Sequence, residues 1–232
     1  MTPTPIVALD FHDASTALAL VDELGEGCRF YKIGGELFTA CGPSIVREVR
    51  ERGADVFLDL KFHDIPNTVS GAVRRAAAMG VRLLTVHAAG GPSMLRAAAT
   101  AAGGSSQCAV LAVTVLTSLD ASEVASLWGR EGQSFQLVDE VVRLSRIAHE
   151  SGASGVVCSG REAKAVKDCL GRAFAVLIPG LRMAGAATHD QSRTSTPAEA
   201  AATGADYVVV GRAVTAAPDR PRAMRELRAQ LG

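Results

Sequence analysis

The chain has 232 residues, and its 24 Lys and Arg balance its 24 Asp and Glu, so the formal net charge is zero. Hydrophobic residues make up 48% of the chain, which is enough for a sizeable core in one domain spanning residues 1–232. A balanced charge without a basic run argues against nonspecific binding to nucleic acid or to an anionic membrane surface.

Short runs rich in Val, Leu and Ile alternate with longer Ala-rich amphipathic stretches. Several runs are almost continuously apolar, as buried parallel strands are. We expect strands at Ile6–Asp10, Arg29–Gly34, Val56–Lys61, Arg82–His87, Cys108–Leu116, Gly155–Cys158, Ala173–Ile178 and Tyr207–Gly211. We expect helices at Ala14–Leu24, Pro43–Arg52, Thr68–Met79, Pro92–Ala102, Phe135–Ser151, Arg161–Leu170, Pro197–Thr203 and Arg220–Leu231.

Glycines stand where four of these helices should end, at Gly53, Gly80, Gly152 and Gly204. Glycine readily adopts the left-handed conformation that closes helices. Eight strand-then-helix units in 232 residues favour a single (βα)8 TIM barrel over an open, doubly wound sheet. In such a barrel the chemistry lies where strands end and the following loops begin.

Charged and polar residues gather at the carboxyl ends of the expected strands. Asp10 ends the first strand, Lys32 lies in the second, and Thr117 and Ser118 follow the fifth. Charged side chains beside apolar strands are costly unless they are paired or used. Their shared position at one end of the barrel indicates a functional site.

The most informative segment is DLKFHDIPNT at residues 59–68. Side chains two apart in a strand point the same way, so Asp59 and Lys61 are expected to face the barrel interior together. Asp64 follows just beyond the strand, before Pro66. A lysine held between carboxylates stays protonated in a partly buried site and can deliver a proton. The alternative interpretation is a salt bridge that only fills the barrel.

A second group of residues indicates an anion site after the seventh and eighth strands. Barrels often bind phosphate there through backbone N–H groups and a helix N-terminus. Gly180 and Gly211 allow close approach of the backbone, and arginine can grip phosphate oxygens with two hydrogen bonds. Arg182, Gln191 and Arg212 are the candidate side chains. The alternative is that these glycines are ordinary turn residues.

The same residues occur in the order of a known family. The string at residues 59–68, together with YKIG at 31–34, PGLR at 179–182 and VGR at 210–212, resembles the orotidine 5′-monophosphate decarboxylases, and the resemblance covers the whole chain. The shorter pattern Asp-x-Lys-x-x-Asp also occurs in related sugar-phosphate enzymes. The ten-residue string with Lys32 and Arg182 in place is much more specific.

This resemblance implies a reaction and a set of roles. Orotidine 5′-monophosphate (OMP) would lose CO2 to give uridine 5′-monophosphate (UMP) in pyrimidine synthesis, without a cofactor. Lys61 would be the general acid, and Asp59 would lie near the substrate carboxylate. Asp10 would contact the ribose, and Lys32 would contact it too as part of the charged array.

The resemblance assigns the remaining residues to other parts of the substrate and to a partner subunit. Thr117 and Ser118 would lie near the pyrimidine. The residues implied to hold the phosphate are Arg182, Gln191, Gly211 and Arg212. In a homodimer with shared active sites, the residues implied to reach the neighbouring site are Asp64, Ile65 and Thr68.

Metal and cofactor chemistry are not indicated by the sequence. The five histidines are dispersed without ligand spacing, so we expect no metal site, and no pyridoxal, thiamine or metal motif offers an electron sink. His87 is expected to fill the core or to support a neighbouring residue. Five cysteines without a Cys-x-x-Cys motif, and no recognisable signal peptide or membrane helix, predict reduced thiols and a cytoplasmic protein.

Two other functions are considered. Magnesium-dependent sugar-phosphate decarboxylases or aldolases resemble the chain around residues 59–64, but typically carry a carboxylate at the position of Lys32. The intact array of Asp59, Lys61 and Asp64 argues against a barrel that binds nucleotides without turnover, because such a protein would not need buried like charges. An assay with OMP discriminates between these functions.

Overall fold

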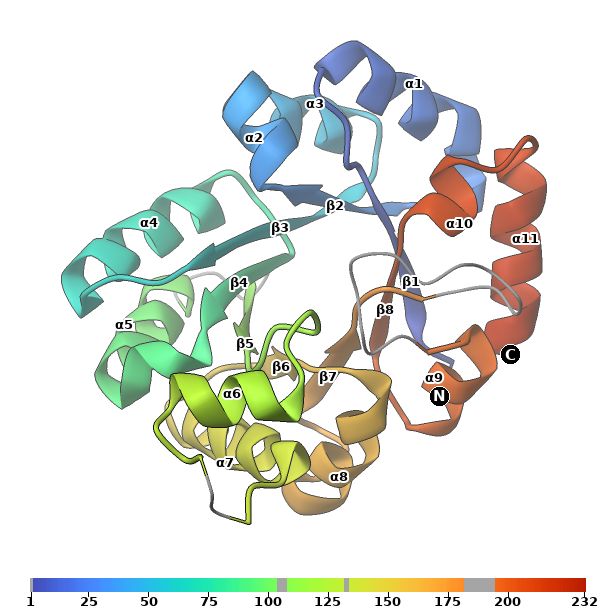
Figure 1. Cartoon of the computed structure of the whole chain (residues 1–232). Helices are drawn as coiled ribbons and strands as arrows, with labels where there is room; N and C mark the ends of the chain where they lie inside the picture. The colour runs from blue at the N-terminus through green and yellow to red at the C-terminus, as the bar shows by residue number, and fades with distance from the viewer. Residues whose placement is uncertain (1, 104–107, 132–133, 182–194) are drawn as a thin grey trace.

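The computed structural model describes residues 2–103, 108–131, 134–181 and 195–232. Eight parallel strands pair in chain order and close into a barrel, with the last strand pairing with the first. They are β1 (Thr4–Ala8), β2 (Phe30–Gly34), β3 (Asp55–Phe62), β4 (Leu83–His87), β5 (Ala109–Val113), β6 (Gly155–Val157), β7 (Ala175–Ile178) and β8 (Tyr207–Val210). Figure 1 shows the strands at the centre with helices around them. The expected (βα)8 barrel is confirmed.

Each helix predicted from the sequence is present, and its two ends lie within two residues of the predicted ones. These helices are α1 (Ala14–Leu24), α3 (Ser44–Glu51), α4 (Pro66–Ala78), α5 (Gly91–Ala102), α7 (Leu137–Glu150), α8 (Gly160–Leu170), α9 (Pro197–Ala202) and α11 (Arg220–Leu231). The structure adds α2 (Gly35–Cys41), α6 (Ala121–Leu127) and α10 (Arg212–Thr215), with 3-10 turns at Gly25–Gly27 and Ala88–Gly90. These additions are too short for a helical repeat of apolar residues to reveal them.

Local sequence explains where the elements stop. Gly53, Gly80, Gly152 and Gly204 follow helices with φ of 74°, 75°, 86° and 79°, which side chains other than glycine rarely adopt. The expected fifth strand, Cys108–Leu116, was too long, because β5 ends at Val113. The apolar run continues past the sheet, and its last residues, Val115 and Leu116, line a cavity.

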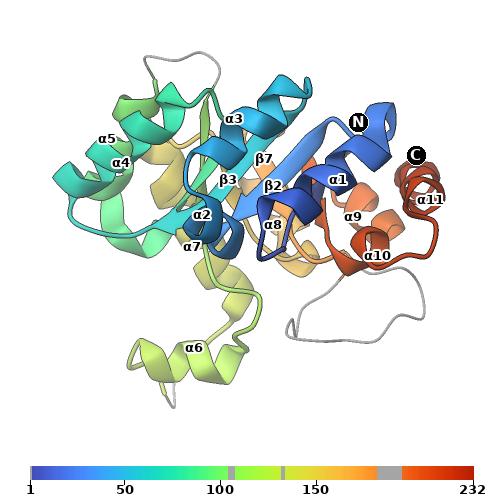
Figure 2. The same cartoon turned by 90° about the horizontal axis from the view of Figure 1, so that it is seen from above.

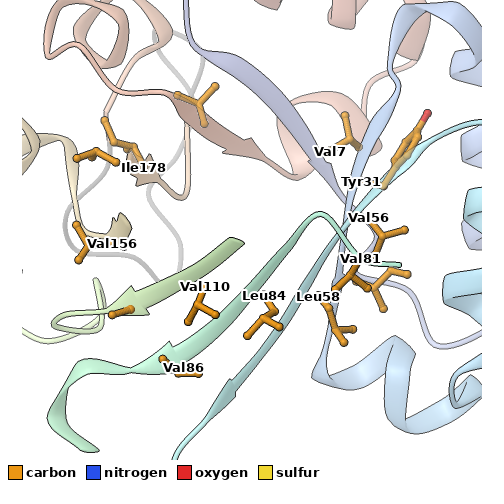
Figure 3. Close-up of a cluster of buried hydrophobic side chains, with 14 of the residues drawn as sticks. Val7, Tyr31, Val56, Leu58, Val81, Leu84, Val86, Val110, Val156 and Ile178 are labelled. Carbon is orange, nitrogen blue, oxygen red and sulfur yellow. The ribbon is translucent and has the colours of Figure 1, made fainter. Parts of the chain in front are cut away.

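Side chains of the strands alternate between two buried layers. In β1, Ile6 and Ala8 point into the barrel, whereas Val7 points towards the helices. Figure 3 shows the outer layer, in which Val56 and Leu58 of β3 take part. The inner layer consists of Ile6, Ala8, Phe30, Phe57, Leu83, Leu111, Val113, Val157, Leu177 and Val209. Burial on both faces explains why the strands are almost continuously apolar in sequence.

Helix α6 stands away from the barrel, as Figure 2 shows. Asp120 caps it by accepting hydrogen bonds from the N–H groups of Ser122 and Glu123, and Val124 is its buried residue. Leu127, at its end, is 67% exposed. Local capping therefore holds this helix more than packing does. No helix in the described ranges combines the length and apolar character needed to cross a membrane.

Candidate active site

A cavity of about 530 Å³ opens at the carboxyl-terminal end of the barrel. Its floor belongs to the inner apolar layer, through Ala8, Phe57, Val113, Val157, Leu177 and Val209. Its wall carries the charged side chains of Asp10, Lys32, Asp59, Lys61 and Arg212. An apolar hollow of this size with a few convergent polar groups is typical of small-molecule sites, and this end of a (βα)8 barrel is where such sites occur.

Lys61 and Asp59 meet at the end of β3. The Lys61 Nζ lies 2.8 Å from Asp59 Oδ2, and the other carboxylate oxygen accepts a hydrogen bond of 2.9 Å from the Thr85 hydroxyl. The Asp59 side chain is only 13% exposed, whereas that of Lys61 is 38% exposed. The carboxylate is therefore held on both oxygens, while the ammonium still reaches the cavity. The Lys61 side chain is thus placed to interact with a group bound in the cavity.

A β-bulge produces this arrangement. Leu58 and Phe62 keep regular pairs with β4, but the three residues between them lie opposite Thr85 alone. Lys61 has φ of 49°, and it is the only non-glycine residue with positive φ in the described ranges. Asp59 and Lys61 share one side as predicted, but the cause is this bulge and not the alternation of a regular strand, which was the wrong reason. The bulge re-aims Lys61, as bulges near functional sites often do.

Lys32 and Asp10 form a second ion pair beside the first. The Lys32 Nζ lies 2.8 Å from Asp10 Oδ1, and the lysine side chain is 13% exposed. Gly34, two residues further on the same face of β2, pairs in register with Asp59 of β3. A Cβ atom added at Gly34 would lie 3.0 Å from Lys32 Nζ. Glycine at this position therefore leaves room for the ammonium on the side of the barrel where Asp59 lies.

Two histidines adjoin the Lys61 pair. The rings of His63 and His87 lie 5.3 Å apart between centroids. Burial lowers the pKa of His87, and the positive charges of His63 and Lys61 lower it further, against the opposing effect of Asp59. A neutral His87 does not compete with Lys61 for the Asp59 carboxylate, which favours its expected role as a supporting residue. The described part of the chain holds no cluster of three His, Cys, Asp or Glu that could bind a metal.

The cavity also collects three of the other predicted site residues that the structure describes. Thr117 lies on its wall after β5, and Gly211 and Arg212 lie on it after β8. Arg212 is the first residue of α10. Ser118 is not among the described residues that line the cavity. The predicted phosphate ligands Arg182 and Gln191 fall outside the described residues.

The segment at the start of α4 lies away from this cavity. Asp64, Ile65 and Thr68 are exposed, and Ile65 is 67% exposed. The Asp64 carboxylate accepts the N–H of Ile65 at 2.6 Å, whereas the ion pair of Lys61 is made with Asp59. Ile65 is extended, with φ of −58° and ψ of 152°, as a residue before proline should be.

Sequence reasoning missed Thr85 and the apolar floor of the cavity. Thr85 is 1% exposed and is the one polar residue between Leu83 and Val86 in an apolar run. A single polar residue within an apolar strand was the feature of the sequence that could have indicated Thr85. The floor could not be separated from ordinary core, because both consist of inward-facing apolar side chains on strands.

Fold and cavity together define a (βα)8-barrel enzyme whose site lies at the carboxyl-terminal mouth. The model of a family described as "Orotidine 5'-phosphate decarboxylase / HUMPS family" matches residues 3–227, and the chain belongs to this family. Two relatives named orotidine 5'-phosphate decarboxylase are each 46% identical to it and are matched by 97% of the chain. The one from Moorella thermoacetica is covered over 91% of its length and the one from Nitrosococcus oceani over 96%.

A solved structure supports the same assignment. The orotidine 5'-phosphate decarboxylase from Lactobacillus acidophilus superposes with a TM-score of 0.85 at 34% sequence identity. The match covers 100% of both chains. The similarity therefore includes the whole barrel.

Proposed function

We propose that the chain decarboxylates OMP to UMP and CO2, the reaction that the names of its relatives describe. The observation that carries the proposal is the Lys61–Asp59 ion pair at the wall of an apolar cavity. Membership of the family supports the substrate class.

The chemistry of the reaction explains why a lysine is needed there. When the bond from C6 to the carboxylate breaks, its electron pair stays on C6 in an orbital orthogonal to the ring π-system. Conjugation cannot absorb this charge, so the protein must supply a positive charge placed where the carbanion forms. We infer that the Lys61 ammonium stabilises this charge and then transfers its proton to C6. Asp59, near the substrate carboxylate, holds the ammonium in place.

Other cavity residues are proposed to bind the rest of the nucleotide. Asp10 and Lys32 would contact the ribose, and Thr117 and Ser118 the pyrimidine. The proposed phosphate ligands are Arg182, Gln191, Gly211 and Arg212. The position of Gly211 and Arg212 on the cavity wall supports this assignment. Phosphate binding is remote from C6, and its energy can be expressed in the transition state.

We further propose that the reaction uses no metal or organic cofactor. Support comes from Lys32, which places an ammonium next to Gly34 where the magnesium-dependent relatives are expected to carry a carboxylate. An ammonium at this position cannot serve as the oxygen ligand that a carboxylate would offer to magnesium. The structure therefore favours the decarboxylase over the sugar-phosphate enzymes.

A homodimer with shared active sites is also proposed. The segment of Asp64, Ile65 and Thr68 supports it, because these residues are exposed and do not line their own cavity. In a two-fold dimer each subunit would lend this segment to its partner. A cytoplasmic location is proposed from the cysteines, all five of which are free thiols. The balanced charge of the chain supports a small-molecule substrate without nucleic-acid or membrane partners.

A direct assay tests the proposed function. Purified protein is mixed with OMP, and the change in ultraviolet absorbance and the formation of UMP are followed. We expect turnover that survives exhaustive EDTA treatment. Lys61→Ala should still bind UMP but lose nearly all kcat, because the group acts in the transition state. Absence of turnover by the native chain, or activity restored only by added magnesium, would refute the proposal.

A further inference from the structure

We propose that Thr85 is a positioning residue that sets the geometry of the Lys61–Asp59 pair, an inference that rests on the proposed decarboxylase function. The Thr85 hydroxyl donates to Asp59 Oδ1 at 2.9 Å. The hydroxyl oxygen of Thr85 in turn accepts a hydrogen bond of 2.9 Å from the backbone N–H of Lys61. A single side chain on β4 is thus bonded to both members of the pair on β3.

The chemistry of the hydroxyl fits these two bonds. A threonine hydroxyl has one donor and two acceptor sites. Its donor is directed to the charged carboxylate, and such hydrogen bonds are stronger than those between neutral groups. The Asp59 carboxylate receives Thr85 on one oxygen and the Lys61 ammonium on the other. Rotation of the carboxylate is thereby restricted from both sides.

The bond to Lys61 acts on the backbone. In a bulge the extra residues lack regular partners in the sheet, and a non-glycine residue with positive φ is strained. Lys61 has φ of 49°, and the Thr85 hydroxyl provides an acceptor for its N–H. Loss of this acceptor would let the bulge relax and turn the lysine side chain away from Asp59.

Thr85 acts through these residues and not on the substrate. It is 1% exposed and does not line the cavity in the described part of the chain. Removal of its hydroxyl should therefore change kcat more than KM, since the groups proposed to bind ribose and phosphate lie on other strands. A role limited to packing would lower stability and leave kcat unchanged.

The test compares three variants. Thr85→Val keeps the shape but removes the hydroxyl, and Thr85→Ser keeps the hydroxyl. Thr114→Val is the matched control, because the buried Thr114 hydroxyl donates to a backbone carbonyl, that of Val157, at 2.9 Å. For each protein we measure kcat and KM for OMP, the dissociation constant of UMP and the melting temperature.

We expect kcat of Thr85→Val to fall about 10- to 100-fold, as when a hydrogen bond to a charged catalytic group is lost. The KM for OMP and the dissociation constant of UMP should change by less than about 3-fold. Thr85→Ser should recover most of kcat, and Thr114→Val should lose stability only. If Thr85→Val does not fold, Thr85→Ala replaces it in the comparison with Thr85→Ser.

The outcomes separate the two proposals. Wild-type kcat in Thr85→Val, in a protein that converts OMP, would overturn the role of Thr85 and leave the proposed function standing. Equal losses of kcat in Thr85→Val and Thr85→Ser, or in Thr85→Val and Thr114→Val, would also overturn it. A native chain without turnover would overturn the proposed function, and the role of Thr85 with it.

Discussion

Lys167 is a buried lysine that ties α8 to the amino-terminal ends of two strands. Its side chain is 8% exposed, and its Nζ lies 2.7 Å from Asp206 Oδ2. It also donates to the carbonyls of Phe174 at 2.8 Å and Arg172 at 3.2 Å. The same Asp206 oxygen accepts the N–H of Val176 at 2.7 Å. One ammonium therefore holds the segments that lead into β7 and β8.

Replacement of this lysine by methionine keeps an unbranched side chain, shorter by the terminal nitrogen, and removes the charge. Two carbonyls and a carboxylate that is 31% exposed would lose their common donor. Breaking a buried pair typically costs 3–5 kcal/mol, and the partial exposure of Asp206 places the expected loss near the lower end, at about 3 kcal/mol. For a chain of this size, that loss should lower the melting temperature by about 6–12 °C.

The same helix provides the control. Lys164 pairs with Asp168 at 2.6 Å, but both side chains are more than 60% exposed. Lys164→Met should therefore cost about 1 kcal/mol or less. Urea and thermal unfolding of Lys167→Met and Lys164→Met measure the difference. Equal losses in the two variants would refute the argument that burial makes the Lys167 contacts important.

Three further predictions concern the site. Gly34→Ala should lower kcat/KM about 10-fold or more, because the added Cβ atom would displace the ammonium of Lys32. Unchanged kinetics would show that the space beside Gly34 is not needed for catalysis. A mixture of Lys61→Ala and Asp64→Ala subunits should regain about a quarter of wild-type activity, because half of the dimers are mixed and each mixed dimer has one intact site. If subunit exchange is demonstrated and no activity returns, the shared site is refuted. Arg212→Ala should weaken UMP binding more than uridine binding, because a charge-assisted hydrogen bond is lost, and equal weakening in a titration would place the phosphate elsewhere.

Much of the barrel follows from patterns that are visible in the sequence. Alternate side chains of a strand, such as Ile6 and Val7, enter the inner and the outer buried layer. A strand is therefore apolar on both faces, and its continuous apolar run reveals its position in the sequence. Glycines such as Gly80 mark helix ends because only their backbone readily takes the required conformation. Charged residues at strand ends, such as Lys32, predict the wall of the cavity.

The rest depends on tertiary pairing that a single sequence does not display. The bulge around Lys61 arises from the register between β3 and β4, and neither strand shows it alone. The role of Thr85 appears only when its hydroxyl is placed opposite that bulge. The sequence places Asp64 just beyond the strand and before Pro66, but its exposure and its place outside the cavity lining are seen only in the structure.

We propose that this chain breaks the C6–carboxylate bond of OMP and that the Lys61 ammonium protonates C6. Turnover of OMP in D2O tests it, with the UMP formed analysed by proton NMR and the CO2 measured in parallel. We predict one CO2 for each UMP, deuterium at C6 of the product, and only traces of both products from Lys61→Ala. Absence of CO2, protium at C6, or undiminished product from Lys61→Ala would contradict the claim.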